Sequence, residues 1–101
     1  MDADSEAAID GMACVGLETR SVTILRATVR SADDYLRHHT KAVVIRLDRA
    51  LALWALHDDV RAASEFRWLG TYLGDKRFFR IADRASARAS RTMRVRGLAQ
   101  P

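Results

Sequence analysis

Residues 31–56, SADDYLRHHTKAVVIRLDRALALWAL, hold no glycine or proline and predict the central helix of the fold. Ser31 is a suitable N-cap, and Asp33 and Asp34 place carboxylates near the positive end of the helix dipole. At about 100° per residue, apolar and charged side chains fall on separate faces. The apolar face consists of Leu36, Val43, Leu47, Ala50, Leu51 and Trp54, and the charged face of Arg37, Lys41, Asp48 and Arg49. We therefore expect one long amphipathic helix that covers a helical core.

The preceding segment, residues 19–30 (TRSVTILRATVR), carries signals for two kinds of structure. Its β-branched residues favour a strand, whereas its apolar residues follow a helical seam with alternating spacings of three and four. The seam consists of Val22, Leu25, Val29, Ala32 and Leu36. We favour a helix over residues 17–30. A strand would have to pair with a second copy, in an arrangement that resembles a ribbon-helix-helix repressor.

The first 16 residues are small and acidic, and their large apolar side chains, Ile9, Met12 and Val15, show no clear period. We expect a flexible acidic arm, with a short helix over residues 5–12 as the alternative. Residues 1–18 contain five carboxylates and no lysine or arginine. The arm could therefore fold back onto a basic surface of the same chain.

On the C-terminal side of the central stretch, His57, Asp58 and Asp59 interrupt the apolar pattern. Either aspartate could cap a helix that runs from about residue 60 to residue 73. Gly74 is predicted to end this helix in the left-handed conformation, and Asp75 to cap the helix that follows.

A helix-turn-helix is an alternative for residues 63–83, because the leucine-glycine pairs at Gly70 and Gly74 resemble the inner part of that motif. The rest of the segment does not match the motif. The later apolar positions of the motif fall on the charged residues Asp75, Arg80 and Asp83.

Residues 75–96, DKRFFRIADRASARASRTMRVR, concentrate the positive charge of the chain. From residue 76 onward there are eight basic side chains and one carboxylate, whereas the whole chain has a net charge of +4. On a helix, five arginines fall within an arc of about 80°, beside an apolar arc. This arginine stripe consists of Arg77, Arg80, Arg84, Arg88 and Arg91, and the apolar arc of Phe78, Ala82, Ala85, Ala89 and Met93.

Three interpretations of the arginine stripe follow from this pattern. Guanidinium groups on one helix face can bind the phosphates of DNA or RNA without reading sequence. They can instead bind an acidic protein surface, with aromatic side chains completing the interface. The candidates for that interface are Phe66, Trp68, Tyr72 and Phe79. Finally, they can pair with carboxylates of the same fold, namely Asp33, Asp34, Asp48, Asp58, Asp59 and Glu65.

Signatures of catalysis and metal binding are missing from the sequence. Cys14 is the only cysteine, and the three histidines do not form a metal-binding pattern. We therefore expect no catalytic residues, no metal and no cofactor. No apolar run is long enough for a membrane span and the N-terminus is acidic, so we expect a cytoplasmic protein with no membrane partner.

These patterns together predict an all-α protein, a small three- to four-helix bundle that forms a homodimer. Its parts are an acidic arm (1–16), a single helical domain (17–96) and a frayed tail (97–101). The expected function is that of a non-enzymatic regulatory or accessory protein that binds nucleic-acid phosphates through the arginine stripe. The alternative is an adaptor or inhibitor subunit that docks its basic helix and aromatic surface on a protein partner.

Overall fold

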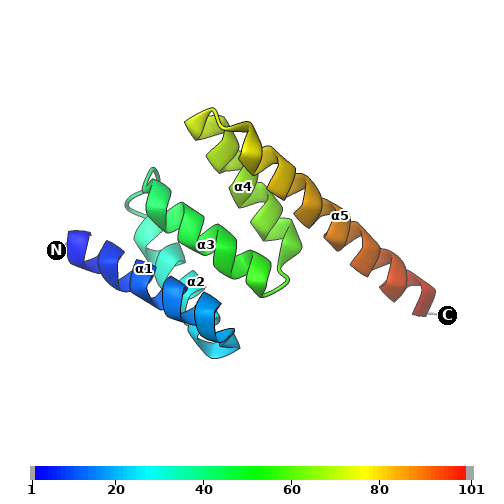
Figure 1. Cartoon of the computed structure of the whole chain (residues 1–101), viewed down its shortest axis with the longest axis horizontal. Helices are drawn as coiled ribbons and strands as arrows, with labels where there is room; N and C mark the ends of the chain where they lie inside the picture. Colours follow the sequence, from blue (N-terminus) through cyan, green and yellow to red (C-terminus); the bar gives the residue numbers. More distant parts are fainter. Residues whose placement is uncertain (1, 100–101) are drawn as a thin grey trace.

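The computed structural model describes residues 2–99 of the chain, with side chains for residues 5–96. Its described part contains five helices and no strand, so the all-α prediction is confirmed and the helix number is five (Figure 1). The helices are α1 (Asp2–Thr19), α2 (Val22–Leu36), α3 (Val43–Ala55), α4 (Asp59–Leu73) and α5 (Lys76–Ala99).

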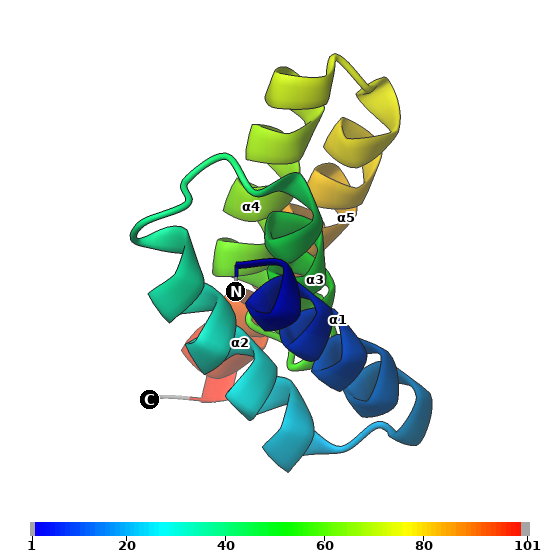
Figure 2. The same ribbon diagram turned by 90° about the vertical axis from the view of Figure 1, so that its left-hand side faces the viewer.

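Helix α3 lies at the centre of the arrangement. It packs against α1, α2 and α4, whereas α5 packs mainly against the outer side of α4. Figure 2, seen from the end where α1 and α2 lie, shows these two helices in front of α3. The molecule measures 52 × 32 × 23 Å, and its longest helix, α5, extends beyond the rest at the C-terminal end (Figure 1).

The prediction of one helix over residues 31–56 is wrong, because the chain turns between α2 and α3. The helix that contains residues 31–36 begins at residue 22, and its N-cap is Ser21, whose hydroxyl accepts a hydrogen bond from the Ile24 N–H at 3.2 Å. In one continuous helix, Leu36 and Ile45 would be about 13 Å apart along the axis. The turn brings both side chains into one buried cluster with Ile9. Burial of apolar side chains therefore outweighs the helical propensity of residues 37–42.

The expectation of a flexible arm is also wrong for the described residues 2–16, which form most of α1. This helix buries Ile9, Ala13 and Gly16 against the rest of the fold. A Cβ atom at Gly16 would lie only 3.0 Å from the Leu25 side chain. The buried face of α1 therefore combines one large residue, Ile9, with small residues that allow close approach.

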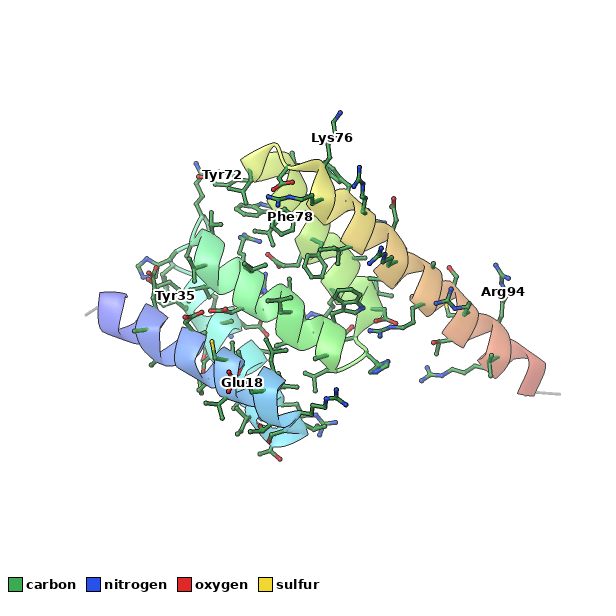
Figure 3. All side chains as sticks on the ribbon, in the orientation of Figure 1. Glu18, Tyr35, Tyr72, Lys76, Phe78 and Arg94 are labelled. Carbon is green, nitrogen blue, oxygen red and sulfur yellow. The ribbon has the colours of Figure 1, made fainter. Side chains whose placement is uncertain are left out.

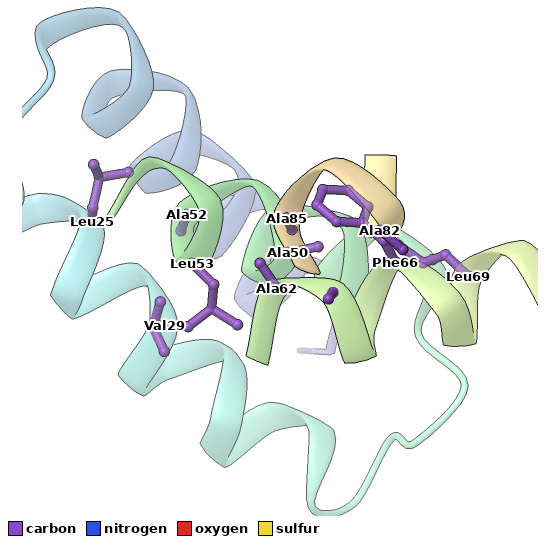
Figure 4. Packing of buried hydrophobic residues seen from close by; sticks show 11 residues of the cluster. Leu25, Val29, Ala50, Ala52, Leu53, Ala62, Phe66, Leu69, Ala82 and Ala85 are labelled. Atoms are coloured by element: carbon purple, nitrogen blue, oxygen red, sulfur yellow. The ribbon is translucent and has the colours of Figure 1, made fainter. Parts of the chain in front are cut away.

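The core centres on Phe66 of α4, whose side chain is fully buried. Its ring lies edge-on to Trp54 at 5.8 Å and stacks on Phe78 at 6.4 Å between centroids. Figure 4 shows the alanines of α3, α4 and α5 that fill the spaces between the helices. The core position corrects the assignment of Phe66 to a protein interface, because a buried side chain cannot contact a partner.

The two ends of the α4–α5 turn follow the predicted capping. Gly74 adopts the left-handed conformation with φ 64° and ψ 34°, and Asp75 Oδ1 accepts a hydrogen bond from the Arg77 N–H at 3.0 Å. Asp58, in contrast, makes no side-chain capping bond to α4. At the C-terminus, residues 97–99 continue α5, and residues 100–101 of the predicted frayed tail lie outside the described residues.

Candidate nucleic-acid interface

The candidate interface is the solvent-facing side of α5. Ala82 and Ala85 are fully buried against the bundle, and this contact fixes which side of the helix faces outward. The opposite side carries exposed basic residues along its length. These are Lys76, Arg77, Arg80, Arg84, Arg91 and Arg94, of which Lys76 and Arg94 point away from the bundle in Figure 3. Lys76 and Arg94 were missed by the sequence prediction because they lie just outside the narrow arc of the stripe.

Arg88 does not belong to this outward surface. Its Nε atom lies 2.8 Å from both carboxylate oxygens of Asp59, and its Nη2 donates a hydrogen bond to the Trp54 carbonyl at 2.7 Å. The Asp59 side chain is only 5% exposed and that of Arg88 is 29% exposed. Arg88 therefore ties α5 to the start of α4 and the end of α3, and its assignment to the nucleic-acid surface is corrected.

Arg77 is exposed but pairs with Asp75 at the start of α5. Its Nη2 lies 2.7 Å from Asp75 Oδ2, and its Nε donates to the same carboxylate. The side-chain hydrogen bonds from Arg77, helped by the backbone bond, lower the pKa of Asp75 to about 2. The pair stays ionised at neutral pH, so Arg77 brings less net charge to the surface than its neighbours do.

Three arginines of the stripe have no such partner. Arg80, Arg84 and Arg91 are exposed and make no hydrogen bond or ion pair with any described residue. They lie on one side of a continuous helix, and about 16 Å separate the first from the last at 1.5 Å per residue. Duplex nucleic acid carries about one charge per 1.7 Å of its axis, so this span reaches several phosphates.

Of the carboxylates that could have neutralised the stripe, Glu65 and Asp33 pair with other arginines. Glu65 pairs with Arg46, at 2.9 Å, and with Arg49. Asp33 pairs with Arg49 at 2.8 Å and with Arg61 at 3.1 Å. These pairs link α2, α3 and α4 inside the bundle. The interpretation that arginines pair within the fold therefore applies to these residues and to Arg88, but not to the three outward ones.

The acidic N-terminal segment does not cover the stripe either. It forms α1, which packs on α2 and α3 at the side of the molecule away from α5 (Figure 1). Among its residues with described side chains, Glu6 and Asp10 face the bundle. Glu6 Oε1 accepts a hydrogen bond from the Tyr35 hydroxyl at 2.8 Å, and Asp10 lies against Asp48.

The aromatic candidates for a protein interface are distributed between core and surface. Trp68 is partly buried and stacks on Tyr72, with 4.7 Å between the ring centroids. Tyr72 and Phe79 are exposed, and the Phe79 ring lies against Gly70, where a Cβ atom would come within 3.0 Å of it. The structure therefore leaves Tyr72 and Phe79, at the α4–α5 end of the molecule, as the accessible members of the set.

Sites for other chemistry are sparse in the part of the chain that the structure describes. No group of three or more histidine, cysteine or acidic side chains there is arranged to hold a metal ion. Cys14 is exposed on α1. A groove of about 530 Å³ lies between α1 and α2, and none of its lining residues belongs to α5. No helix among these residues is long and apolar enough to cross a membrane.

Comparisons of this chain with protein families, with curated protein sequences and with solved structures found no match.

Proposed function

We propose that this protein binds the phosphate backbone of nucleic acid through Arg80, Arg84 and Arg91, as a non-enzymatic regulatory or accessory factor. The observation that supports this most is the row of three exposed guanidinium groups on one helix face without carboxylate partners among the described residues. Lys76 and Arg94 extend the positive surface at either end. Contacts of this kind provide affinity and orientation but little sequence preference.

The way α5 is held to the bundle favours this function. The Arg88–Asp59 pair and the buried alanines fix one side of the helix, so the outward arginines are presented from a rigid support. Arginine suits the role because its planar guanidinium donates two parallel hydrogen bonds to a phosphate. Binding releases counterions from the nucleic acid, and the affinity should therefore depend strongly on salt.

The test is fluorescence anisotropy with labelled DNA and RNA over a range of salt concentrations. If three or four phosphates are contacted, log affinity should fall against log salt with a slope of roughly −3 to −4. The double variant Arg80→Glu/Arg84→Glu should lose binding. Its matched control is Arg26→Glu/Arg30→Glu, because these arginines are also exposed and one turn apart, but lie on α2. Equal loss in both variants, or no binding by the native protein at low salt, would refute the proposal.

A second candidate function, docking on an acidic protein partner, is supported by the end of α5. Met93 is 65% exposed there, about one turn before the basic residue Arg96. Such a mixture of apolar and guanidinium groups is typical of interfaces. The same surface is where we propose that a homodimer forms.

Sedimentation velocity and affinity capture test this second function. The second function predicts that the native protein retains a stoichiometric acidic partner, and the proposed homodimer predicts that it sediments as a dimer. Met93→Asp should abolish both associations. Asp83→Asn, an exposed substitution elsewhere on α5, serves as the control. A native protein that captures no partner would rule this function out, and a monomeric native protein would rule out the homodimer.

A further inference from the structure

An ordered stack of side chains lies at the end of α4 that is next to the candidate interface. The Arg46 guanidinium carbon lies 3.8 Å from the centroid of the Trp68 ring, and the Tyr72 ring stacks on Trp68 at 4.7 Å with 15° between the ring planes. Arg46 is in turn fixed by Glu65 and by a hydrogen bond of 2.7 Å from its Nε to the Thr40 carbonyl. Arg46 therefore holds the Trp68 ring in place, and Trp68 in turn holds the Tyr72 ring.

The outer ring of this stack, that of Tyr72, is accessible to solvent. Tyr72 is 50% exposed, although Trp68 stacks against it. An aromatic face of this kind, held in place from below, suits a planar ligand because the ring loses little freedom on binding.

The position of Tyr72 links the stack to the basic surface. Tyr72 lies in the last turn of α4, and Lys76 begins α5 directly after the turn at Gly74 and Asp75. Figure 3 shows Tyr72 and Lys76 at the same end of the molecule, with Lys76 pointing into solvent. The Tyr72 ring is on the side of α4 that carries Trp68 and faces Arg46 of α3, so a strand whose phosphates follow α5 from Arg91 towards Lys76 would reach the ring by passing around the α4–α5 turn.

We propose that Tyr72 is a stacking platform for an unpaired nucleobase, so that the preferred ligand of this protein is single-stranded nucleic acid. This inference rests on the proposed function of α5. In a duplex each base is already stacked on its neighbours, and its face is not available to a tyrosine. Stacking on an aromatic ring tolerates any base, which is consistent with phosphate contacts that do not read sequence.

The test measures two ligands against one set of variants by fluorescence anisotropy at low salt. The ligands are an oligothymidylate of about 15 nucleotides and a duplex of the same length. The native protein should prefer the single strand. Tyr72→Ala should weaken single-strand binding about 5- to 100-fold, the loss expected for one stacked base, while duplex binding changes less than twofold. Arg80→Glu/Arg84→Glu should abolish the binding of both ligands.

Two controls separate stacking from damage to the helix end. Tyr72→Phe keeps the ring and should keep single-strand affinity, whereas Leu73→Ala removes a side chain of similar exposure and should change it less than twofold. The inference is overturned if Tyr72→Ala leaves single-strand affinity unchanged, or if either control loses as much affinity as Tyr72→Ala. If only the arginine variant loses affinity, the proposed function of α5 is supported and the stacking role of Tyr72 is refuted. If the native protein binds neither ligand, both proposals fail.

Discussion

A carboxylate is buried on each side of α3, but the groups that face the two carboxylates differ in charge. Glu65 of α4 and Asp48 of α3 are both 6% exposed. Glu65 faces two guanidinium groups, those of Arg46 and Arg49. Asp48 faces a second carboxyl group, that of Asp10 on α1. The α3–α4 interface is therefore joined by opposite charges. The α1–α3 interface is joined by a carboxyl–carboxylate hydrogen bond, which requires that one of the two groups is protonated.

The consequence for Asp48 is a raised pKa. Burial, the hydrogen bond with Asp10 and the negative charge of Asp10 raise the pKa of Asp48 to about 7. The Oδ2 atom of Asp48 is also buried and lacks a hydrogen-bond partner among the described residues. A carboxyl group that remains protonated near neutrality can donate a hydrogen bond to its neighbour, and that bond is lost when the group ionises.

The largest effect should come from breaking the oppositely charged side of this comparison. Glu65→Gln leaves the partly buried guanidinium of Arg46 without its countercharge and that of Arg49 with Asp33 alone, and we expect a loss of about 3–5 kcal/mol in the free energy of unfolding. Urea denaturation measures this loss. The control is Asp34→Asn, which removes the exposed ion pair with Arg37 and should cost less than about 1 kcal/mol. Similar costs for the two variants would contradict the structural role of Glu65.

A second, smaller effect is expected at the α4–α5 interface, which is also joined by opposite charges. Arg88→Met leaves Asp59 buried without its partner and should lower the free energy of unfolding by about 3 kcal/mol. Arg84→Met, one turn earlier and without a partner among the described residues, should stay within about 0.5 kcal/mol of the native protein. Hydrogen exchange should show faster opening of α5 in the Arg88 variant only. Equal stability of the two variants would mean that the two arginines do not differ in role.

The contrast between Arg84 and Arg88 shows what the sequence can predict about this site. Helical periodicity places both arginines on one face, and the structure places both on α5 as expected. Asp59, the partner of Arg88, lies 29 residues away, and no local pattern connects the two. The sequence could therefore predict a small set of arginines on one helix face. It could not predict that a buried carboxylate binds Arg88, because that contact depends on the packing of α4 against α5.

The fold shows the same division between local and long-range signals. Gly74 and Asp75 act through nearby backbone atoms, and the sequence predicted their capping roles. The turn at residues 37–42 contains no glycine or proline, and it forms because Leu36 and Ile45 share a buried cluster. Likewise, the sequence predicts α1 only if Ala13 and Gly16 are known to be buried against other helices. Both features depend on contacts between different helices, so the periodicity within one segment could not reveal them.

The smallest of the three effects is expected at the α1–α3 interface, where the free energy of unfolding should depend on pH. This dependence tests the comparison of the two interfaces directly. A pKa raised on folding means that the folded state binds more protons than the unfolded state, so stability falls as pH rises from about 4 to about 7. Asp48→Asn cannot ionise, and its amide can donate to the Asp10 carboxylate. We expect this variant to match the native protein at pH 5 and to exceed its free energy of unfolding by roughly 2 kcal/mol at pH 8. Urea denaturation at both pH values measures the difference. A difference that is constant with pH, or that favours the native protein at pH 8, would show that the Asp10–Asp48 contact does not depend on a proton.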